Sequence, residues 1–283
     1  MHVVLMVNSK CNKQCKHCYL PYTGFRTPTE TLKTIDELQK DNHTITIAGS
    51  ETLLDTDYLA AYKKIGQNYL LTNGILLNDN PLLYNLLQEA GIEKLIFSIH
   101  FGISDELNSV SENLVAKVIQ ESKKLGFKIQ ITTTITQENY CNISEMCEKS
   151  IQYEADILQF NRLILQGNSP LNDMKTLTEK QIEIFFQQIL ACREVYPKEI
   201  LYIKPQGNFG PRPGSKGELL SIKNEYCPAG KNLVAIDPQN RVYSCPFLMT
   251  PNNIIGKYEN GHIIIEQELS YLKRNTCLTI AMS

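Results

Sequence analysis

Short apolar runs and longer amphipathic stretches alternate along the first two-thirds of the chain. Short apolar runs predict strands, whereas apolar residues at helical spacing, with Gly or a capping box at an end, predict helices. The expected strands are residues 3–7, 44–47, 69–71, 94–99, 128–134 and 157–160. The expected helices lie near residues 29–40, 57–66, 81–90, 112–125, 143–151 and 178–195.

This alternation predicts an α/β fold, a partial (β/α)6 barrel of the TIM type that is open on one side and spans residues 1–204. Residues 205–214 are dense in Pro and Gly and indicate a linker. We therefore expect a second, small domain over residues 205–283. Its expected elements are a β-hairpin of residues 232–236 and 241–244, followed by a short helix over 266–273.

Three cysteines, Cys11, Cys15 and Cys18, follow the first expected strand with C-x3-C-x2-C spacing. The residues between them are polar, so packing in a core explains them poorly. Thiolates are soft ligands that suit an iron–sulfur cluster, and three of them leave one iron of a [4Fe–4S] cluster open to a small molecule. Zinc is the alternative metal, with His17 as a fourth ligand.

The cysteine run resembles that of the radical S-adenosylmethionine (SAM) enzymes, with His17 where an aromatic residue is usual. Four later segments resemble further motifs of the family, in the right order: 48–54 its Gly-Gly-Glu-Pro segment, 71–74 its Thr-Asn-Gly turn, 97–101 its Ser-x-Asp segment, and 161–167 its late Arg-Leu and glycine pair. The resemblance implies an oxidoreductase-type enzyme. Such an enzyme cleaves SAM reductively at the cluster to a 5′-deoxyadenosyl radical and abstracts hydrogen from its substrate.

The resemblance also implies which residues contact SAM. Ser98 and His100 are expected at the ribose, and His100 departs from the usual carboxylate, although an imidazole also hydrogen-bonds a hydroxyl. The alternatives are that 72–74 is only a turn and that Arg162 forms a surface ion pair. The other expected contacts are Gly49, Ser50 and Glu51 at the methionine amino group, the Tyr19 backbone at the adenine, and Arg162 at the methionine carboxylate.

A second set of cysteines lies in the last third of the chain, where Cys227 and Cys245 flank the expected hairpin and Cys277 follows. This arrangement resembles the SPASM or twitch extension, which implies a second, auxiliary [4Fe–4S] cluster on these three thiols. It departs from the usual paired C-x2-C because Cys277 stands alone, and the alternative is a hairpin without metal. Cys141 precedes a helix and is the candidate hydrogen donor. Cys147 and Cys192 lie in amphipathic runs and are expected in the core.

Charge and composition limit the partners. A net charge of −2 and a pI near 6.2 give no electrostatic footprint for nucleic acid or an anionic membrane. No export signal or spanning segment is evident, so nine cysteines indicate a cytoplasmic metalloprotein.

The substrate is the least determined feature. Enzymes of this layout often oxidise, crosslink or epimerise peptides, so we expect peptide maturation, with flavodoxin or ferredoxin as external electron donor. Oxidation or decarboxylation of a small sugar-like metabolite is the alternative. A non-catalytic iron–sulfur or zinc protein is the alternative from another class.

Overall fold

The computed structural model describes residues 1–21, 23–102, 111–169, 173–206, 209 and 228–267. All six expected strands and all six expected helices are present, and their ends lie within two residues of the expected ones. The strands of the barrel are β1 (His2–Asn8), β2 (Thr44–Gly49), β3 (Tyr69–Thr72), β4 (Lys94–Ser98), β5 (Lys128–Ile135), β6 (Ile157–Arg162) and β7 (Tyr202–Pro205). The helices are α1 (Pro28–Lys40), α2 (Leu59–Ile65), α3 (Ile75–Asp79), α4 (Leu83–Glu89), α5 (Glu112–Lys124), α6 (Ile143–Gln152) and α7 (Glu179–Val195).

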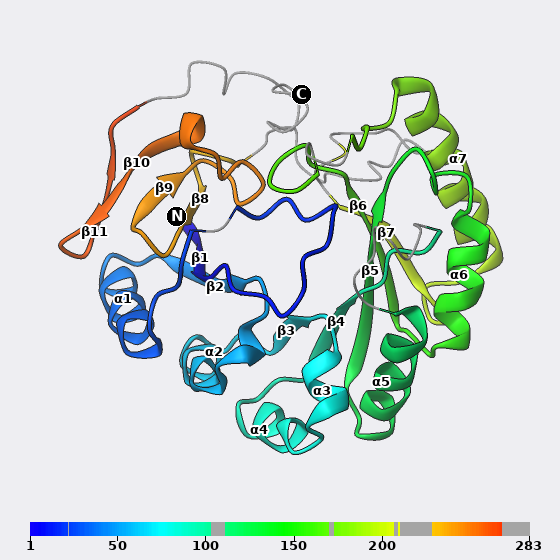
Figure 1. Ribbon diagram of the computed structural model, residues 1–283, viewed down its shortest axis with the longest axis horizontal. Helices are drawn as coiled ribbons and strands as arrows, with labels where there is room; N and C mark the ends of the chain where they lie inside the picture. Colours follow the sequence, from blue (N-terminus) through cyan, green and yellow to red (C-terminus); the bar gives the residue numbers. More distant parts are fainter. Residues whose placement is uncertain (22, 103–110, 170–172, 207–208, 210–227, 268–283) are drawn as a thin grey trace.

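The strands form the inside of an arc and the helices cover its outside (Figure 1). Strands β3 to β7 make a parallel sheet in chain order, and β1 pairs parallel with β2. Most of the strand residues that face the helices are apolar, for example Leu5, Leu95 and Ile131, each 0% exposed. The expected α/β fold with a partial barrel is confirmed.

Two elements of the barrel were not expected. Helix α3 is a single short turn after β3, and β7 is a four-residue strand that pairs with β6. Strand β7 escaped notice because it is short and runs directly into the Pro- and Gly-rich stretch. It crosses residue 204, where we expected the barrel to end, and the division into two domains stays a prediction.

The side chain of Gln67 joins β2 to β3, between which no ladder pairing is found in the described residues. Its Oε1 accepts from the Ile47 N–H at 2.7 Å, and its Nε2 donates to the carbonyls of Ile47 and Tyr69 at 3.1 and 3.2 Å. The buried side-chain amide of Gln67 therefore supplies hydrogen bonds where β2 and β3 do not pair directly, and it links the two sheets of the barrel.

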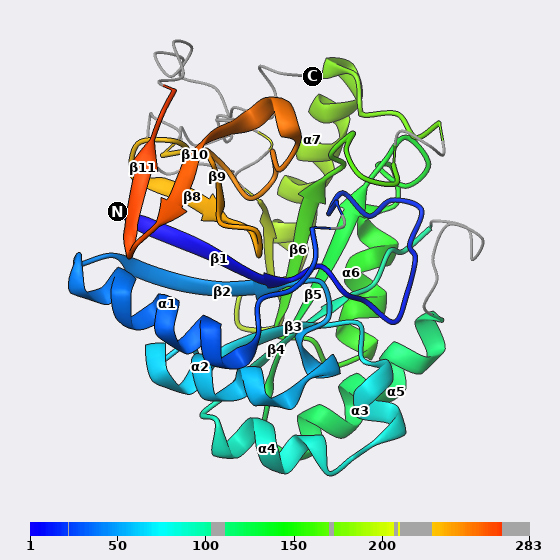
Figure 2. The same ribbon diagram turned by 60° about the vertical axis from the view of Figure 1, so that its left-hand side comes forward.

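The C-terminal strands extend the barrel sheet from its other end, beside β1 (Figure 2). Strand β8 (Leu233–Ile236) pairs parallel with β1, and β8 and β9 (Arg241–Tyr243) form the expected hairpin, which is confirmed. Strands β10 (Ile254–Glu259) and β11 (His262–Ile265) complete a six-stranded sheet in the order β11-β10-β9-β8-β1-β2. The helix expected near 266–273 lies almost wholly outside the described residues.

The Arg26 guanidinium fixes the hairpin to the start of α1. It donates to the Asp237 carbonyl at 3.0 Å and to Asn240 Oδ1 at 2.8 Å.

Within the described part of the chain, no helix is both long enough and apolar enough to cross a membrane.

Candidate active site

One cavity of about 460 Å³ lies within the barrel and reaches the ends of its strands. Strands β1 to β6 all contribute to its wall, together with the loop that follows β1. This loop crosses the opening of the arc toward β6 in Figure 1. Nine of the residues that the sequence singled out line the cavity: Cys11, Cys15, His17, Cys18, Tyr19, Gly49, Ser50, Ser98 and His100.

The cysteine loop is held through its backbone by the segment after β6. Asn168 donates from its N–H to the Cys18 carbonyl at 2.8 Å and from Nδ2 to the Cys15 carbonyl at 3.1 Å. Gln166 Nε2 donates to the Tyr19 carbonyl at 3.0 Å. Gly167 has a φ of 65°, and a Cβ there would lie 2.6 Å from the Cys18 carbonyl oxygen, so only glycine allows this contact.

The three thiols lie close enough for their charges to affect one another's pKa. Burial raises the pKa of the Cys18 thiol, and the charges of Cys15 and Cys11 raise it further. In the described part of the chain, no three His, Cys, Asp or Glu side chains lie close enough together to hold one metal ion. The donor set itself fits an iron–sulfur cluster, because three thiolates are the soft ligands that such clusters use.

Glu51 does not line the cavity, because its carboxylate is 0% exposed and faces the turn after β3. Its Oε2 accepts from Thr72 Oγ1 at 3.0 Å and from the Asn73 N–H at 2.8 Å. Burial raises the pKa of Glu51 to about 7, and the hydrogen bonds from Asn73, Thr72 and Leu53 limit the rise. Glu51 therefore ties the loop after β2 to the loop after β3.

Asn73 belongs to the segment that resembles the family's Thr-Asn-Gly turn, and our sequence analysis gave it no contact of its own. Its Nδ2 donates to Asn12 Oδ1 at 2.7 Å and lies 3.7 Å from Cys11 Sγ, so it contacts the cysteine loop. The Asn-Gly dipeptide explains the turn but gives no sign of this contact.

His100 and His17 pack together in the cavity wall, with ring centroids 3.8 Å apart. The Thr134 N–H donates to His100 Nδ1 at 3.2 Å, so the neutral ring carries its proton on Nε2. Burial, and then the neighbouring His17, lower the pKa of His100 well below its usual value. His100 is therefore a neutral donor at physiological pH.

Two other candidates lie away from the cavity wall. Arg162 is 9% exposed, and it follows Asn161, which does line the cavity, so the strand alternation turns Arg162 to the opposite face. Cys141 is exposed, in the turn before α6, and is not among the residues of the wall. The roles of both stay predictions.

The hairpin brings Cys245 next to the cavity. Cys245 is buried, and the two residues after it, Pro246 and Phe247, line the wall. The rings of Phe247 and Tyr19 lie 5.5 Å apart. Burial raises the pKa of Tyr19, and charges on Cys18 and Cys245 add to it, so Tyr19 lies near both of these thiols. Cys227 and Cys277 lie outside the described residues, and the auxiliary cluster stays a prediction.

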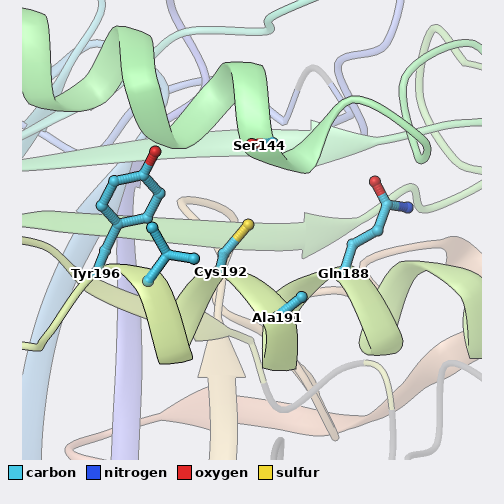
Figure 3. Close-up of a pocket in the computed structure, with 6 residues that line it drawn as sticks. Ser144, Gln188, Ala191, Cys192 and Tyr196 are labelled. Carbon is cyan, nitrogen blue, oxygen red and sulfur yellow. The ribbon is translucent and has the colours of Figure 1, made fainter.

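Cys147 and Cys192 are buried where α6 meets α7, as expected for core thiols. A hydrogen bond between them raises the pKa of Cys147 and lowers that of Cys192. Cys192 also lines a second cavity of about 150 Å³, with Ser144 across from it and Tyr196 just after the end of α7 (Figure 3).

The part of the cavity wall formed by β5, β6 and Gln206, which we call the lower wall, is polar. Our sequence analysis missed this feature. The inward residues of β5 and β6 are amides and hydroxyls, where a packed barrel would have apolar side chains. The alternation of polar and apolar residues within residues 128–135 was visible, but we read it only as a strand. The polar wall residues are Gln130, Thr132, Thr134, Gln159, Asn161 and Gln206.

The fold and the cysteine-lined cavity are those of a radical SAM protein. The family model of the Radical SAM superfamily matches residues 5–149, and the chain belongs to this superfamily. It is similar to the mycofactocin maturase MftC of Mycobacterium tuberculosis, with 24% identity over 267 residues that cover 87% of this chain and 64% of the relative. It is also similar to the GTP 3′,8-cyclase of Aquifex aeolicus, with 26% identity over 279 residues that cover 86% of this chain and 81% of the relative.

Solved structures share the fold. Streptococcus suis SuiB matches with a TM-score of 0.70 and 16% identity, over 96% of this chain and 64% of that one. A structure of anSMEcpe with bound AdoMet matches with a TM-score of 0.63 and 16% identity, over 91% of this chain and 77% of that one. The chain thus spans less than two thirds of the length of MftC and SuiB.

Proposed function

We propose that this protein is a radical SAM enzyme that modifies a peptide. The observation that carries the proposal is the convergence of Cys11, Cys15 and Cys18 with the loops after β2, β3 and β4 on one cavity. When bound at these cysteines, a [4Fe–4S] cluster supplies the electron that cleaves SAM to a 5′-deoxyadenosyl radical, which removes hydrogen from the substrate.

The residues of the chain orient these groups. Asn168 holds the carbonyls of Cys15 and Cys18 and so fixes the spacing of the thiols. The Nε2–H of neutral His100 donates to a ribose hydroxyl, and Gly49 and Ser50 border the methionine amino group. Pro246 and Phe247 cover the cavity from the hairpin side and exclude water.

A peptide substrate is supported by the relatives. MftC is named a maturase. A structure of SuiB bound to the precursor peptide SuiA matches this chain with a TM-score of 0.67. A small molecule is the second candidate, because the relative of which this chain covers 81% is a GTP 3′,8-cyclase. Either substrate would enter the polar lower part of the cavity.

Anaerobic reconstitution tests the chemistry. The protein should bind about four irons at the first site, or about eight with an auxiliary cluster, and release 5′-deoxyadenosine from SAM when an external donor such as flavodoxin reduces it. Cys15→Ala should abolish this release, whereas the matched Cys147→Ala should retain it. Binding of zinc in place of iron, or intact clusters without SAM cleavage, would refute the enzyme.

The substrate class needs a separate experiment. A short peptide encoded beside this gene should lose two hydrogen atoms on oxidation or crosslinking, or gain one deuterium from solvent on epimerisation, as read by mass spectrometry. If such peptides stay unmodified while SAM is cleaved, the peptide proposal fails and the small-molecule candidate is favoured.

A further inference from the structure

Three lysines lie on the inner side of β4, β5 and β7, beyond the residues that line the cavity; Lys94 and Lys204 are half-buried and Lys128 is exposed. Lys94 and Lys128 are cross-strand neighbours on β4 and β5, and each lies two residues before a cavity residue on its own strand. Lys204 on β7 lies two residues before Gln206, which lines the cavity. Side chains two residues apart on a strand share a face, so all three lysines point to the cavity side.

These lysines repel one another, and no carboxylate among the described residues pairs with them. Burial, and then Lys94 and Lys128, lower the pKa of Lys204, while burial and Lys128 lower that of Lys94. Lys94 Nζ lies 4.8 Å from the centre of the Tyr69 ring, whose quadrupole compensates it only in part. The adjacent Glu93 accepts a hydrogen bond from Asn68, and none of the three lysines has an ion pair in the described part of the chain.

The cavity floor has a second unsatisfied group. The Oε1 of Gln206 is buried and has no hydrogen-bond partner among the described residues. Elsewhere in the cavity wall, Gln130 Nε2 donates to Gln159 Oε1 at 3.4 Å, and Gln159 Nε2 to Asn161 Oδ1 at 2.9 Å, so those amides are already engaged. Since a buried acceptor without a donor is costly, an N–H or O–H of the substrate, separate from any anionic group, would satisfy Gln206.

We propose that Lys94, Lys128 and Lys204 form an anion-binding floor of the barrel cavity, which holds a carboxylate or phosphate group of the substrate. Four residues separate Lys94 from Ser98 on β4, which places the floor about 13 Å along the strand from the end that bears the SAM-binding motifs. The substrate thus carries its anionic group about this far from the carbon that loses hydrogen. The inference rests on the proposed function only in assigning the cavity to the substrate.

Calorimetric titration of the full chain with two anionic probes tests the floor. Inorganic triphosphate represents a phosphate source, acetyl-Glu-Glu-Glu-amide represents a carboxylate source, and acetyl-Gln-Gln-Gln-amide is the neutral control. We expect at least one anionic probe to bind, and each Lys→Gln change at the floor to weaken it about fivefold. The triple variant should weaken it more than 50-fold, and the triple Lys→Arg variant should restore it to within about threefold of the unaltered protein.

A matched triple variant separates site binding from net charge. Lys33, Lys63 and Lys117 are exposed on outer helices, and changing them to Gln alters the net charge equally. This variant should bind the probe as the unaltered protein does. The stronger probe identifies the source of the anion. Absence of binding by both probes, or binding that survives the floor triple variant, would overturn the proposal.

Two further readouts keep the outcome interpretable. If the floor triple variant does not fold, the three single variants decide, each with its expected fivefold loss. Release of 5′-deoxyadenosine by the unaltered protein is measured separately. Its absence would refute the proposed function while the titration still decides on the anion-binding floor.

Discussion

The buried carboxyl of Glu51 predicts a pH dependence of stability that follows from the fold. Burial raises its pKa from 4.5 to about 7, so the native state keeps a proton that the unfolded chain loses above about pH 4.5. Between these values the unfolded state binds fewer protons than the native state. The free energy of unfolding therefore falls as the pH rises from about 4.5 to 7.

The magnitude follows from the two pKa values. One pKa unit corresponds to about 1.4 kcal/mol, so the full loss above pH 7 is about 3 kcal/mol. About 2 kcal/mol of it accumulates between pH 5 and pH 7.5. Glu51 is 0% exposed, and solvent screening therefore reduces this figure little.

The Glu51→Gln variant removes the titration and keeps the shape of the side chain. The stability of this variant relative to the unaltered protein should rise by about 2 kcal/mol from pH 5 to pH 7.5, measured by urea unfolding at equal iron content. The new amide can face the Leu53 N–H, which now donates to Oε1 at 3.4 Å, but that cost is independent of pH and cancels in the comparison.

Glu30→Gln is the matched control. Hydrogen bonds from the backbone and side chain of Thr27 lower the pKa of Glu30, so this carboxylate titrates below the tested range. Its stability difference should be nearly flat between pH 5 and pH 7.5. A flat or falling difference for Glu51→Gln would refute the assignment of a protonated buried carboxyl.

Three further variants test the site and the strands around it. Gly167→Ala should lower the iron bound after reconstitution and cost at least about 2 kcal/mol more than Gly91→Ala, since both glycines have positive φ but only the first meets backbone atoms. Gln67→Ala should cost about 2–4 kcal/mol in urea unfolding, because it leaves buried groups of β2 and β3 unpaired. Replacing both Cys147 and Cys192 by Ala should lower stability by about 1–3 kcal/mol and leave the iron content unchanged.

The barrel elements were predictable because their signals are local. The capping box of Thr178 and Gln181, for instance, marks the start of α7 and is present as expected. Contacts between distant segments carry no such signal. The pairing of β8 with β1 joins residues more than two hundred positions apart. Gln67 looks in the sequence like an ordinary polar loop residue, and nothing near it indicates its contacts with β2 and β3. Lys94 and Lys128 were likewise visible only as the first residues of expected strands, and Lys204 lay in no expected strand.

The site shows why this chain departs from its family's pattern at some positions and not at others. At Gly49 a Cβ would lie 2.9 Å from the buried Thr52 side chain and 3.1 Å from Asn8 Oδ1, so glycine is required. At Ser50 the backbone N–H alone is used, donating to Asn8, and a side chain is tolerated. His100 replaces a carboxylate but gains a backbone hydrogen bond from β5 that fixes its tautomer. The positions that hold the loops through the backbone therefore constrain the sequence more strongly than those that present a side chain to the cavity.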